Sequence, residues 1–527
     1  MVAHSHIVRG VPTASAMNSE TRDRSLVSRS PGRRTADLSS RQRSLRPHSI
    51  PEVTGMTTTK TRRSKRENPT RTISLFAAGI FFLIPLVFTF DGLTIAGHRM
   101  FAIFLVAIVL WVTEAIPLYS TAVLIIMLEI LMVSDQALVG LPGSFEPRAF
   151  RDYFSALADP VLMLFLGGFF LAMGASKFRL DKAMARTLLR PFGDSPARIM
   201  LGLMLITGGF SMFMSNTATT ATMMAVVLPV VATLDPKDRL RAGMVLAIPI
   251  AANIGGIGTP VGTPPNAIAI GQLSASGTSV SFGKWMLMAV PAALALLIFA
   301  WWMLRRLFPS ESTSMKLSID AEFDRSRPAR IFYVVFAVTV IMWLTESVHG
   351  LSSSVVGFIP VVVLLAMQVF NEKDLQNVQW HVLWLVAGGI ALGRGVADSG
   401  LDSWLISLIT WENIGPSVIA AAFAVVALML STVISNSASA NLLVPIGLAL
   451  TTAGAIDLDP LIVGFVIAIG ASLAMALPIS TPPNAIAYSS GLVKTGDMAR
   501  AGLIIGVVGL ILFLFVSPAI WSVLGIA

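Results

Sequence analysis

The chain has no cysteine and few charged residues. The absence of cysteine excludes disulfide bonds, thiolate catalysis and cysteine metal sites. Only 13% of the 527 residues are charged, whereas 54% are hydrophobic, and the mean hydropathy is +0.76. Because soluble domains carry about 25% charged residues, this composition predicts a multi-pass, all-α integral membrane protein.

The formal net charge of +9 belongs to the N-terminal segment. Residues 1–71 carry 15 lysines and arginines against 5 aspartates and glutamates, so the rest of the chain is almost neutral. The segment is rich in Ser, Thr, Arg and Pro and lacks apolar periodicity, which predicts a disordered basic tail. An alternative is that translation begins at Met56. Nothing in the nearly neutral remainder indicates a nucleic-acid partner.

About eleven apolar stretches have roughly the 20 residues that a helix needs to cross the hydrocarbon core. They lie near 73–90, 99–117, 119–134, 159–177, 242–271, 284–307, 331–349, 353–370, 381–398, 460–490 and 501–525. Two further uncharged segments, 199–234 and 413–452, are interrupted in the middle by polar clusters. We expect both to be re-entrant hairpins whose tips reach the middle of the membrane, where protein must shelter the backbone. The alternative is two short spanning helices in each segment.

The linkers between these spans differ in charge on the two sides of the membrane. The inner linkers, which are rich in Lys and Arg, are 177–198, 235–241 and 305–330. The outer linkers, which contain Asp but no Lys or Arg, are 395–412 and 453–459. The positive-inside rule therefore places the N-terminus in the cytoplasm, and an odd number of crossings places the C-terminus outside the plasma (inner) membrane.

Four landmarks recur in the same order in both halves of the chain, at offsets of 232, 221, 220 and 218 residues. They are Trp-x-Thr-Glu at 111–114 and 343–346, Gly-Gly at 167–168 and 388–389, Ser-Asn clusters at 215–219 and 435–439, and Thr-Pro-Pro-Asn at 263–266 and 481–484. With five spans in each half, a duplication must turn the second copy upside down. We expect a first repeat over 72–307, a cytoplasmic linker over 308–330 and an inverted second repeat over 331–527. Hairpin 199–234 would then enter from the cytoplasm and hairpin 413–452 from outside.

The Thr-Pro-Pro-Asn sequences interrupt the uncharged runs 242–271 and 460–490. Proline blocks a helix interior and moves the preceding residue out of the α region, but Thr followed by Pro is a favourable helix start. Each run is therefore predicted to be a broken helix that restarts at Thr263 or Thr481. A restart within the membrane presents free N–H groups and a positive dipole end, which bind an anion without a charged side chain.

The Ser-Asn clusters offer hydroxyl and amide oxygens to a hard cation such as Na+. Ser211 lies one helical turn before Ser215, and Ser431 lies one turn before Ser435. A lone Ser-Asn pair more often joins membrane helices, but two copies at a matched offset favour cation ligands. Because no Arg or Lys lies in the four motifs, helix ends and bound cations would balance the charge of an anion.

Several isolated residues are assigned structural roles. Glu114 and Glu346 lie near the ends of predicted spans, which favours interfacial or packing roles over a proton relay. Arg394 is expected to extend toward the membrane surface. The ten tryptophans are expected to anchor the membrane interfaces.

On these motifs, residues 73–527 resemble the divalent anion/Na+ symporter family, the carriers of di- and tricarboxylates and sulfate. The resemblance implies a homodimer in which a transport domain moves past a static scaffold domain, in an elevator mechanism. The Na+ ligands that it implies are Ser211, Ser215, Asn216 and Gly262 in a first site and Ser431, Ile434, Asn436 and Ser480 in a second. The substrate contacts that it implies are Asn216, Thr217, Asn436, Ser437, Thr481 and Pro482, with Thr263 and Pro264 at the pseudo-symmetric positions. Ser437 departs from the family's Thr, which leaves the choice among dicarboxylate, tricarboxylate and sulfate open.

The resulting expectation is Na+-coupled uptake of a C4-dicarboxylate such as succinate, malate or fumarate. Na+ would be a transported co-ion, and no organic cofactor is expected. Alternatives with the same fold are a Na+-independent anion exchanger and a sulfate or tricarboxylate carrier. A channel or an enzyme is disfavoured, because the sequence has no acidic pore ring, His/Glu metal motif or Gly-x-Ser-x-Gly sequence.

Overall fold

The computed structural model describes residues 69–523, apart from 142–144, 311, 313, 316–320, 409–413 and 453. These residues belong to one compact unit, Arg66–Ala527, and all regular structure in them is helical. The predicted basic tail lies outside the described residues as far as position 68. Its last three residues, 69–71, begin the first helix, whose first position is Pro69, where a missing N–H removes no helical hydrogen bond.

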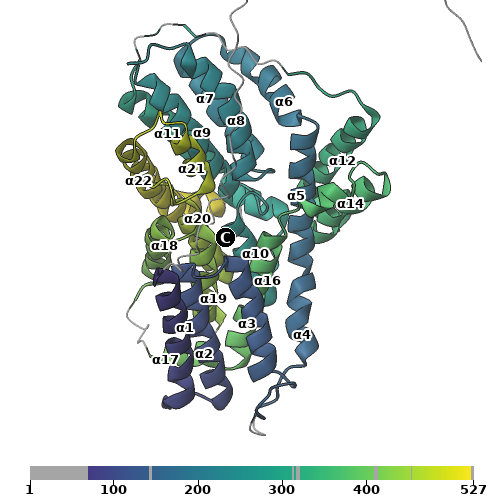
Figure 1. The fold of residues 1–527 in the computed structure, drawn as a ribbon, viewed down its shortest axis with the longest axis vertical. Helices are drawn as coiled ribbons and strands as arrows, with labels where there is room; N and C mark the ends of the chain where they lie inside the picture. The colour runs from purple at the N-terminus through teal and green to yellow at the C-terminus, as the bar shows by residue number, and fades with distance from the viewer. Residues whose placement is uncertain are drawn as a thin grey trace, which may run out of the picture. The chain divides into compact units, whose positions relative to one another are not determined.

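The helices of the first half run from purple to teal in Figure 1. They are α1 Pro69–Val87, α2 Ile95–Thr113, α3 Leu118–Met132, α4 Phe150–Ser155, η1 Ala156–Ala158, α5 Pro160–Lys177, α6 Leu180–Leu189, η2 Arg190–Phe192, α7 Pro196–Ser211, α8 Asn216–Ala232, α9 Leu240–Ile257, α10 Pro264–Ala275 and α11 Phe282–Leu307.

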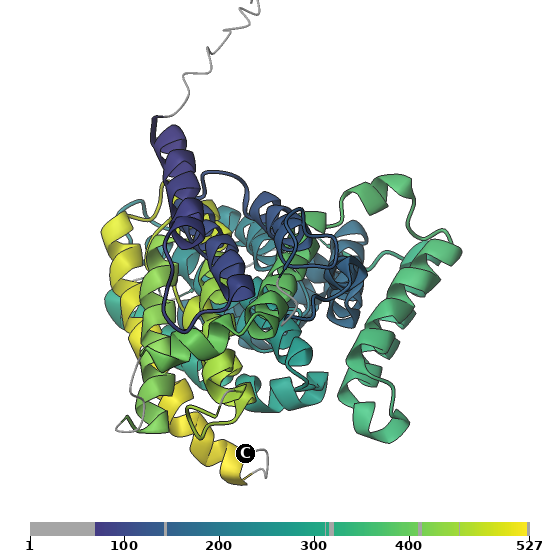
Figure 2. The same ribbon diagram turned by 90° about the horizontal axis from the view of Figure 1, so that it is seen from below.

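The helices of the second half run from green to yellow, and Figure 2 shows α12 and α14 at one edge of the bundle. They are α12 Arg327–Leu344, α13 Glu346–His349, α14 Ser353–Ala366, α15 Glu372–Gln376, α16 Trp380–Asp398, α17 Leu401–Ser407, α18 Pro416–Val433, α19 Asn436–Thr452, α20 Pro460–Ser472, α21 Pro482–Ser489, α22 Thr495–Ile511, η3 Leu512–Val516 and α23 Ser517–Val523.

Nine helices in the described ranges are long and apolar enough to cross a membrane. Eight of them coincide with predicted spans, and the ninth is α18, one arm of the segment 413–452. The predicted spans 119–134, 353–370 and 460–490 contain shorter helices, α3, α14 and α20, of 15, 14 and 13 residues. Helix length alone therefore does not reproduce the predicted number of about eleven spans, because these three helices are shorter than a full crossing.

Both Thr-Pro-Pro-Asn sequences interrupt a helix where the sequence predicts it. Helix α9 ends at Ile257 and α10 begins at Pro264, whereas α20 ends at Ser472 and α21 begins at Pro482. The preceding threonines are extended N-caps, with φ of −147° for Thr263 and −142° for Thr481. Proline then takes a position at which its missing N–H removes no helical hydrogen bond.

The Ser-Asn clusters likewise separate α7 from α8 and α18 from α19. Helices α7 and α8 pack on α9, and α18 and α19 pack on α20. Glycine permits the closest approaches, since a Cβ at Gly255 would collide with the Gly208 carbonyl and one at Gly470 with the Ala424 carbonyl. The halves also interlock, because α10 packs on α19 and α20, while α21 packs on α8 and α9.

The expectation that the tryptophans anchor the membrane interfaces is wrong for four of them. Trp111, Trp285, Trp343 and Trp521 are fully buried, and each indole N–H donates to a backbone carbonyl. Trp285, for example, donates to the carbonyl of Ile257, where α9 ends. A buried helix end offers such unpaired carbonyls, and the sequence does not show which side chain reaches them.

Candidate functional site

A cavity of about 400 Å³ lies where the four helix interruptions meet. The lining residues from the two Ser-Asn clusters are Ser215, Asn216, Thr217, Ser435, Asn436 and Ser437. The lining residues from the two Thr-Pro-Pro-Asn links are Gly262, Thr263, Pro264, Ser480, Thr481, Pro482 and Pro483. Motifs that are separated by more than two hundred residues in the chain thus form one wall.

The cavity wall has no Asp, Glu, Lys or Arg among the residues that the structure describes. Its titratable side chains are Tyr119 and His381, whose rings lie 6.3 Å apart. The N-terminal ends of α8, α10, α19 and α21 all reach this wall. Their free N–H groups and positive dipole ends create an environment that favours an anion without any positive side chain.

The amide of Asn216 lies among oxygen atoms of the first half. It is 2.5 Å from the Ser211 hydroxyl oxygen. In the orientation that satisfies the amide, its nitrogen donates to the carbonyls of Gly262 at 3.1 Å and Ala252 at 3.3 Å. In the opposite orientation the amide oxygen accepts from the Ser211 hydroxyl and faces the two carbonyls, an arrangement that a cation among these oxygens would stabilise. Ser211 is fully buried, so this oxygen cluster lies behind the cavity wall.

A second oxygen cluster surrounds Ser431 in the other half. Its hydroxyl oxygen lies 2.7 Å from both Asn436 Oδ1 and the Ala471 carbonyl. Because a hydroxyl has one proton, only one of these oxygens receives it. Ile434 ends α18 with extended backbone, φ −112° and ψ −179°, and Ser480 donates to the Thr432 carbonyl at 3.1 Å. This cluster is therefore also richer in acceptors than in donors.

All of the predicted substrate-contact residues lie on the cavity wall, and the predicted cation ligands divide into two sets. The substrate-contact residues on the wall are Asn216, Thr217, Thr263, Pro264, Asn436, Ser437, Thr481 and Pro482. The cation-ligand residues on the wall are Ser215, Asn216, Gly262, Asn436 and Ser480. Ser211, Ser431 and Ile434 are not on it, and the two serines are buried behind it.

Several residues that sequence reasoning missed also line the cavity. Tyr119, Gln379 and His381 come from the starts of α3 and α16, and Phe165 comes from α5. No motif marks these four, because packing between helices of the two halves brings them here. Asn253 in α9 was also missed, although a lone amide within an uncharged run was a signal. Its side-chain nitrogen donates to Thr481 Oγ1 at 3.2 Å and to Asn484 Oδ1 at 3.3 Å.

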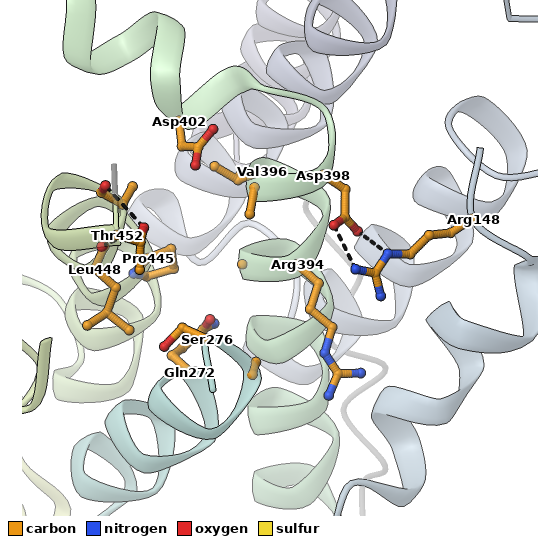
Figure 3. A pocket seen from close by; sticks show the side chains of 14 residues that line it. Arg148, Gln272, Ser276, Arg394, Val396, Asp398, Asp402, Pro445, Leu448 and Thr452 are labelled. Carbon is orange, nitrogen blue, oxygen red and sulfur yellow. Dashed lines mark hydrogen bonds and ion pairs between the residues drawn. The ribbon is translucent and has the colours of Figure 1, made fainter. Parts of the chain in front are cut away.

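A smaller cavity of about 100 Å³ adjoins α10, α16 and α19 (Figure 3). Arg148 points toward Asp398 and donates to it at 2.8 Å. Arg394, expected at the membrane surface, instead donates to Asp159 at 2.8 Å. That expectation is wrong because Asp159 is only 5% exposed and a buried carboxylate needs a cationic partner. Burial raises the pKa of the Asp402 carboxyl. Hydrogen bonds from Ser403 and from the Asp402 backbone act in the opposite direction but do not cancel this effect. Since both arginines are already paired, this cavity does not offer a free cation to an anion.

Residues 65–527 match a family described as "Sodium:sulfate symporter transmembrane region". A "Sodium-dependent dicarboxylate transporter SdcS" from Staphylococcus saprophyticus is 31% identical over 485 residues, which cover 84% of this chain and 90% of the relative. A protein of the same name from Staphylococcus aureus is 30% identical over 495 residues, which cover 86% of this chain and 92% of the relative.

Among solved structures, the chain is similar to the Alcanivorax borkumensis YdaH transporter, with a TM-score of 0.51 and 13% sequence identity. The match covers 77% of this chain and 98% of that one. At this identity the likeness shows the fold alone, an all-helical membrane protein with multiple spans.

Proposed function

The chain belongs to the sodium:sulfate symporter family, whose members are membrane transporters and not enzymes, and we propose that it couples Na+ entry to uptake of a C4-dicarboxylate such as succinate, malate or fumarate. The observation that carries this proposal is a cavity whose described wall has no charged side chain, formed by four helix starts and backed by two oxygen clusters. The names of the two Staphylococcus relatives support dicarboxylate as the substrate class.

The duplicated motifs suit an anion that has a carboxylate at each end. Asn216 and Thr217 from α8 line one part of the cavity, and Asn436 and Ser437 from α19 line another. Amide N–H and hydroxyl groups donate to carboxylate oxygens, and the bonds are strengthened by the charge of the acceptor. Each helix start adds backbone donors and a positive dipole end. Thr263, Pro264, Thr481 and Pro482 place the remaining two helix starts on the same wall.

The asparagines provide a direct route for coupling between cation and anion. We assign Ser211, Ser215, Asn216 and Gly262 to one Na+ site, and Ser431, Ile434, Asn436 and Ser480 to the other. A cation held by the Asn216 amide oxygen turns its nitrogen away from the carbonyls of Gly262 and Ala252. That nitrogen is then free to donate to the carboxylate in the cavity. Cation and anion each favour the same amide orientation, so each raises the affinity for the other.

For alternating access, we propose that α7–α8 and α18–α19 are re-entrant hairpins that enter from the cytoplasm and from outside, respectively. Both hairpins and both broken helices would move together as a transport domain against a scaffold of the remaining helices. The interlocking of α10 with α20 and of α21 with α9 supports movement as one body. The proposal includes a homodimer in the plasma membrane. We place the N-terminus in the cytoplasm and the C-terminus outside, because the linkers rich in Lys and Arg are predicted on the cytoplasmic side.

The test is uptake of radiolabelled succinate, citrate and sulfate into proteoliposomes that contain the purified protein, with a Na+ gradient or with K+ in its place. We expect succinate to accumulate only with the Na+ gradient. Equal uptake in K+ would rule out symport. In that case, stimulation by succinate preloaded inside would identify an exchanger, and non-saturable current would identify a channel. Light scattering in detergent measures whether two copies associate.

A further inference from the structure

The two Thr-Pro-Pro-Asn links differ in one neighbour that comes from the opposite half. The last residue of each Thr-Pro-Pro-Asn sequence is Asn266 or Asn484. Its side-chain nitrogen donates to backbone carbonyls that lie shortly before the same sequence in the chain. These equivalent bonds confirm the offset of 218 residues. The same offset places Ala471 opposite Asn253. The amide of Asn253 therefore has no counterpart in the second half.

Asn253 crosses between the halves to bind the second link. Because Asn484 directs its nitrogen toward backbone carbonyls, its oxygen faces Asn253, which must present its own nitrogen. That nitrogen lies 3.3 Å from Asn484 Oδ1 and 3.2 Å from Thr481 Oγ1. Asn253 is only 3% exposed, yet it lines the cavity.

Thr481 consequently receives two N–H donors. The Asn253 side chain and the backbone N–H of Asn484, at 3.3 Å, both donate to its hydroxyl oxygen. A hydroxyl has two acceptor lone pairs and one proton. Both acceptor positions are thus used, and the proton remains for a third partner. Thr481 lines the cavity, so this proton is available to an acceptor that binds there.

The first link lacks this arrangement. Thr263 lines the cavity, but its hydroxyl forms no hydrogen bond with any described residue and does not cap α10. Asn266 Oδ1 is buried without a partner among those residues, and the position equivalent to Asn253 is an alanine, Ala471, which has no side-chain donor. The Thr263 hydroxyl is therefore free to rotate between donor and acceptor orientations.

We propose that Asn253 is a positioning residue that fixes the Thr481 hydroxyl as a hydrogen-bond donor to a substrate carboxylate. This inference rests on the proposed dicarboxylate transport. It makes the two ends of the site unequal, since the end at Thr481 has a preoriented donor and the end at Thr263 does not. A preoriented donor strengthens binding, because the hydroxyl has no rotational freedom left to lose when the substrate binds.

A double-mutant cycle in proteoliposomes tests the proposal. Asn253→Ala should raise the KM for succinate by about tenfold, the size of one hydrogen bond to a charged group. At saturating succinate it should not change the Na+ concentration for half-maximal uptake. Thr481→Val removes the hydroxyl, and adding Asn253→Ala to it should produce no further increase. In the matched Thr263→Val background, Asn253→Ala should retain its full effect.

The possible outcomes separate the inference from the proposed function. A wild-type protein without Na+-driven uptake of succinate overturns the proposed function. A working wild type in which the effects of Asn253→Ala and Thr481→Val multiply overturns this inference alone, since a merely structural role predicts that result. If Asn253→Ala reduces the folded yield, Asn253→Leu provides the same cycle in an uncharged side chain of similar size. Leucine has no N–H to donate to Thr481, so it should raise the KM about as much.

Discussion

The two halves of the molecule share helix breaks but differ in the side chains around them. Gly262 in the first link corresponds to Ser480 in the second, and Thr217 corresponds to Ser437. Helix starts bind an anion through backbone groups, so both halves can supply this attraction with different side chains. The side-chain differences should instead affect the hydrogen bonds at each end of the cavity and the choice of anion. Four comparisons of equivalent positions would separate the shared role from the divergent one.

The largest effects are expected where the halves agree. Asn216→Ala and Asn436→Ala should each reduce Na+-driven succinate uptake by more than about 100-fold, because each removes an amide proposed to bind both cation and anion. Initial uptake rates in proteoliposomes measure the loss. Size-exclusion chromatography should show the same assembly as wild type. Near-normal uptake by either variant would contradict the proposed coupling.

A reciprocal swap should be strongly unequal. In Gly262→Ser, the new Cβ would collide with the Gly256 carbonyl, so the backbone must shift and uptake should fall by about tenfold or more. Ser480→Gly loses the bond to the Thr432 carbonyl, and a net loss of about 1 kcal/mol corresponds to about fivefold. The Na+ dependence of uptake provides the measurement. Equal effects of the two substitutions would show that the close approach at Gly262 is unimportant.

The difference between Thr217 and Ser437 should affect selectivity more than rate. Ser437→Thr adds a methyl group to the cavity wall and should weaken inhibition by citrate relative to succinate by about tenfold at most, the lower end for a single methylene. Thr217→Ser is the matched variant and should relax the discrimination. Competition against radiolabelled succinate measures both. An unchanged citrate-to-succinate ratio in both variants would remove these residues from substrate selection.

The smallest effect is expected at Glu129, which lies opposite Val361 at the offset of 232 residues. Glu129 is fully buried, and neither carboxyl oxygen has a hydrogen-bond partner within the described part of the chain. Because there is no such bond to lose, Glu129→Gln should change uptake by less than about twofold and Tm by less than about 2 °C. Thermal unfolding in detergent and uptake rates check this. A large loss of uptake with an unchanged Tm would show that the carboxyl group takes part in transport.

Local chemistry predicted the helix breaks correctly. Proline fixes its own φ, restricts the residue before it and lacks a backbone N–H. All three effects act within one helical turn, so Thr263 and Thr481 could be identified as helix starts from sequence. Hydropathy likewise placed most of the spans. The interfacial role was wrong for four tryptophans, and so was the surface position for Arg394, because their buried partners belong to other segments of the chain.

By itself, the sequence determined where helices stop, where uncharged runs are interrupted and that the interruptions occur in pairs. Tertiary structure alone decided that these interruptions share a wall with Tyr119 and His381, and that Asn253 binds Thr481 at a separation of 228 residues. The physical reason is that helix starts depend on neighbouring residues. A buried polar group, by contrast, must find its hydrogen-bond partner wherever packing places one, since leaving it unpaired is unfavourable by about 1–3 kcal/mol.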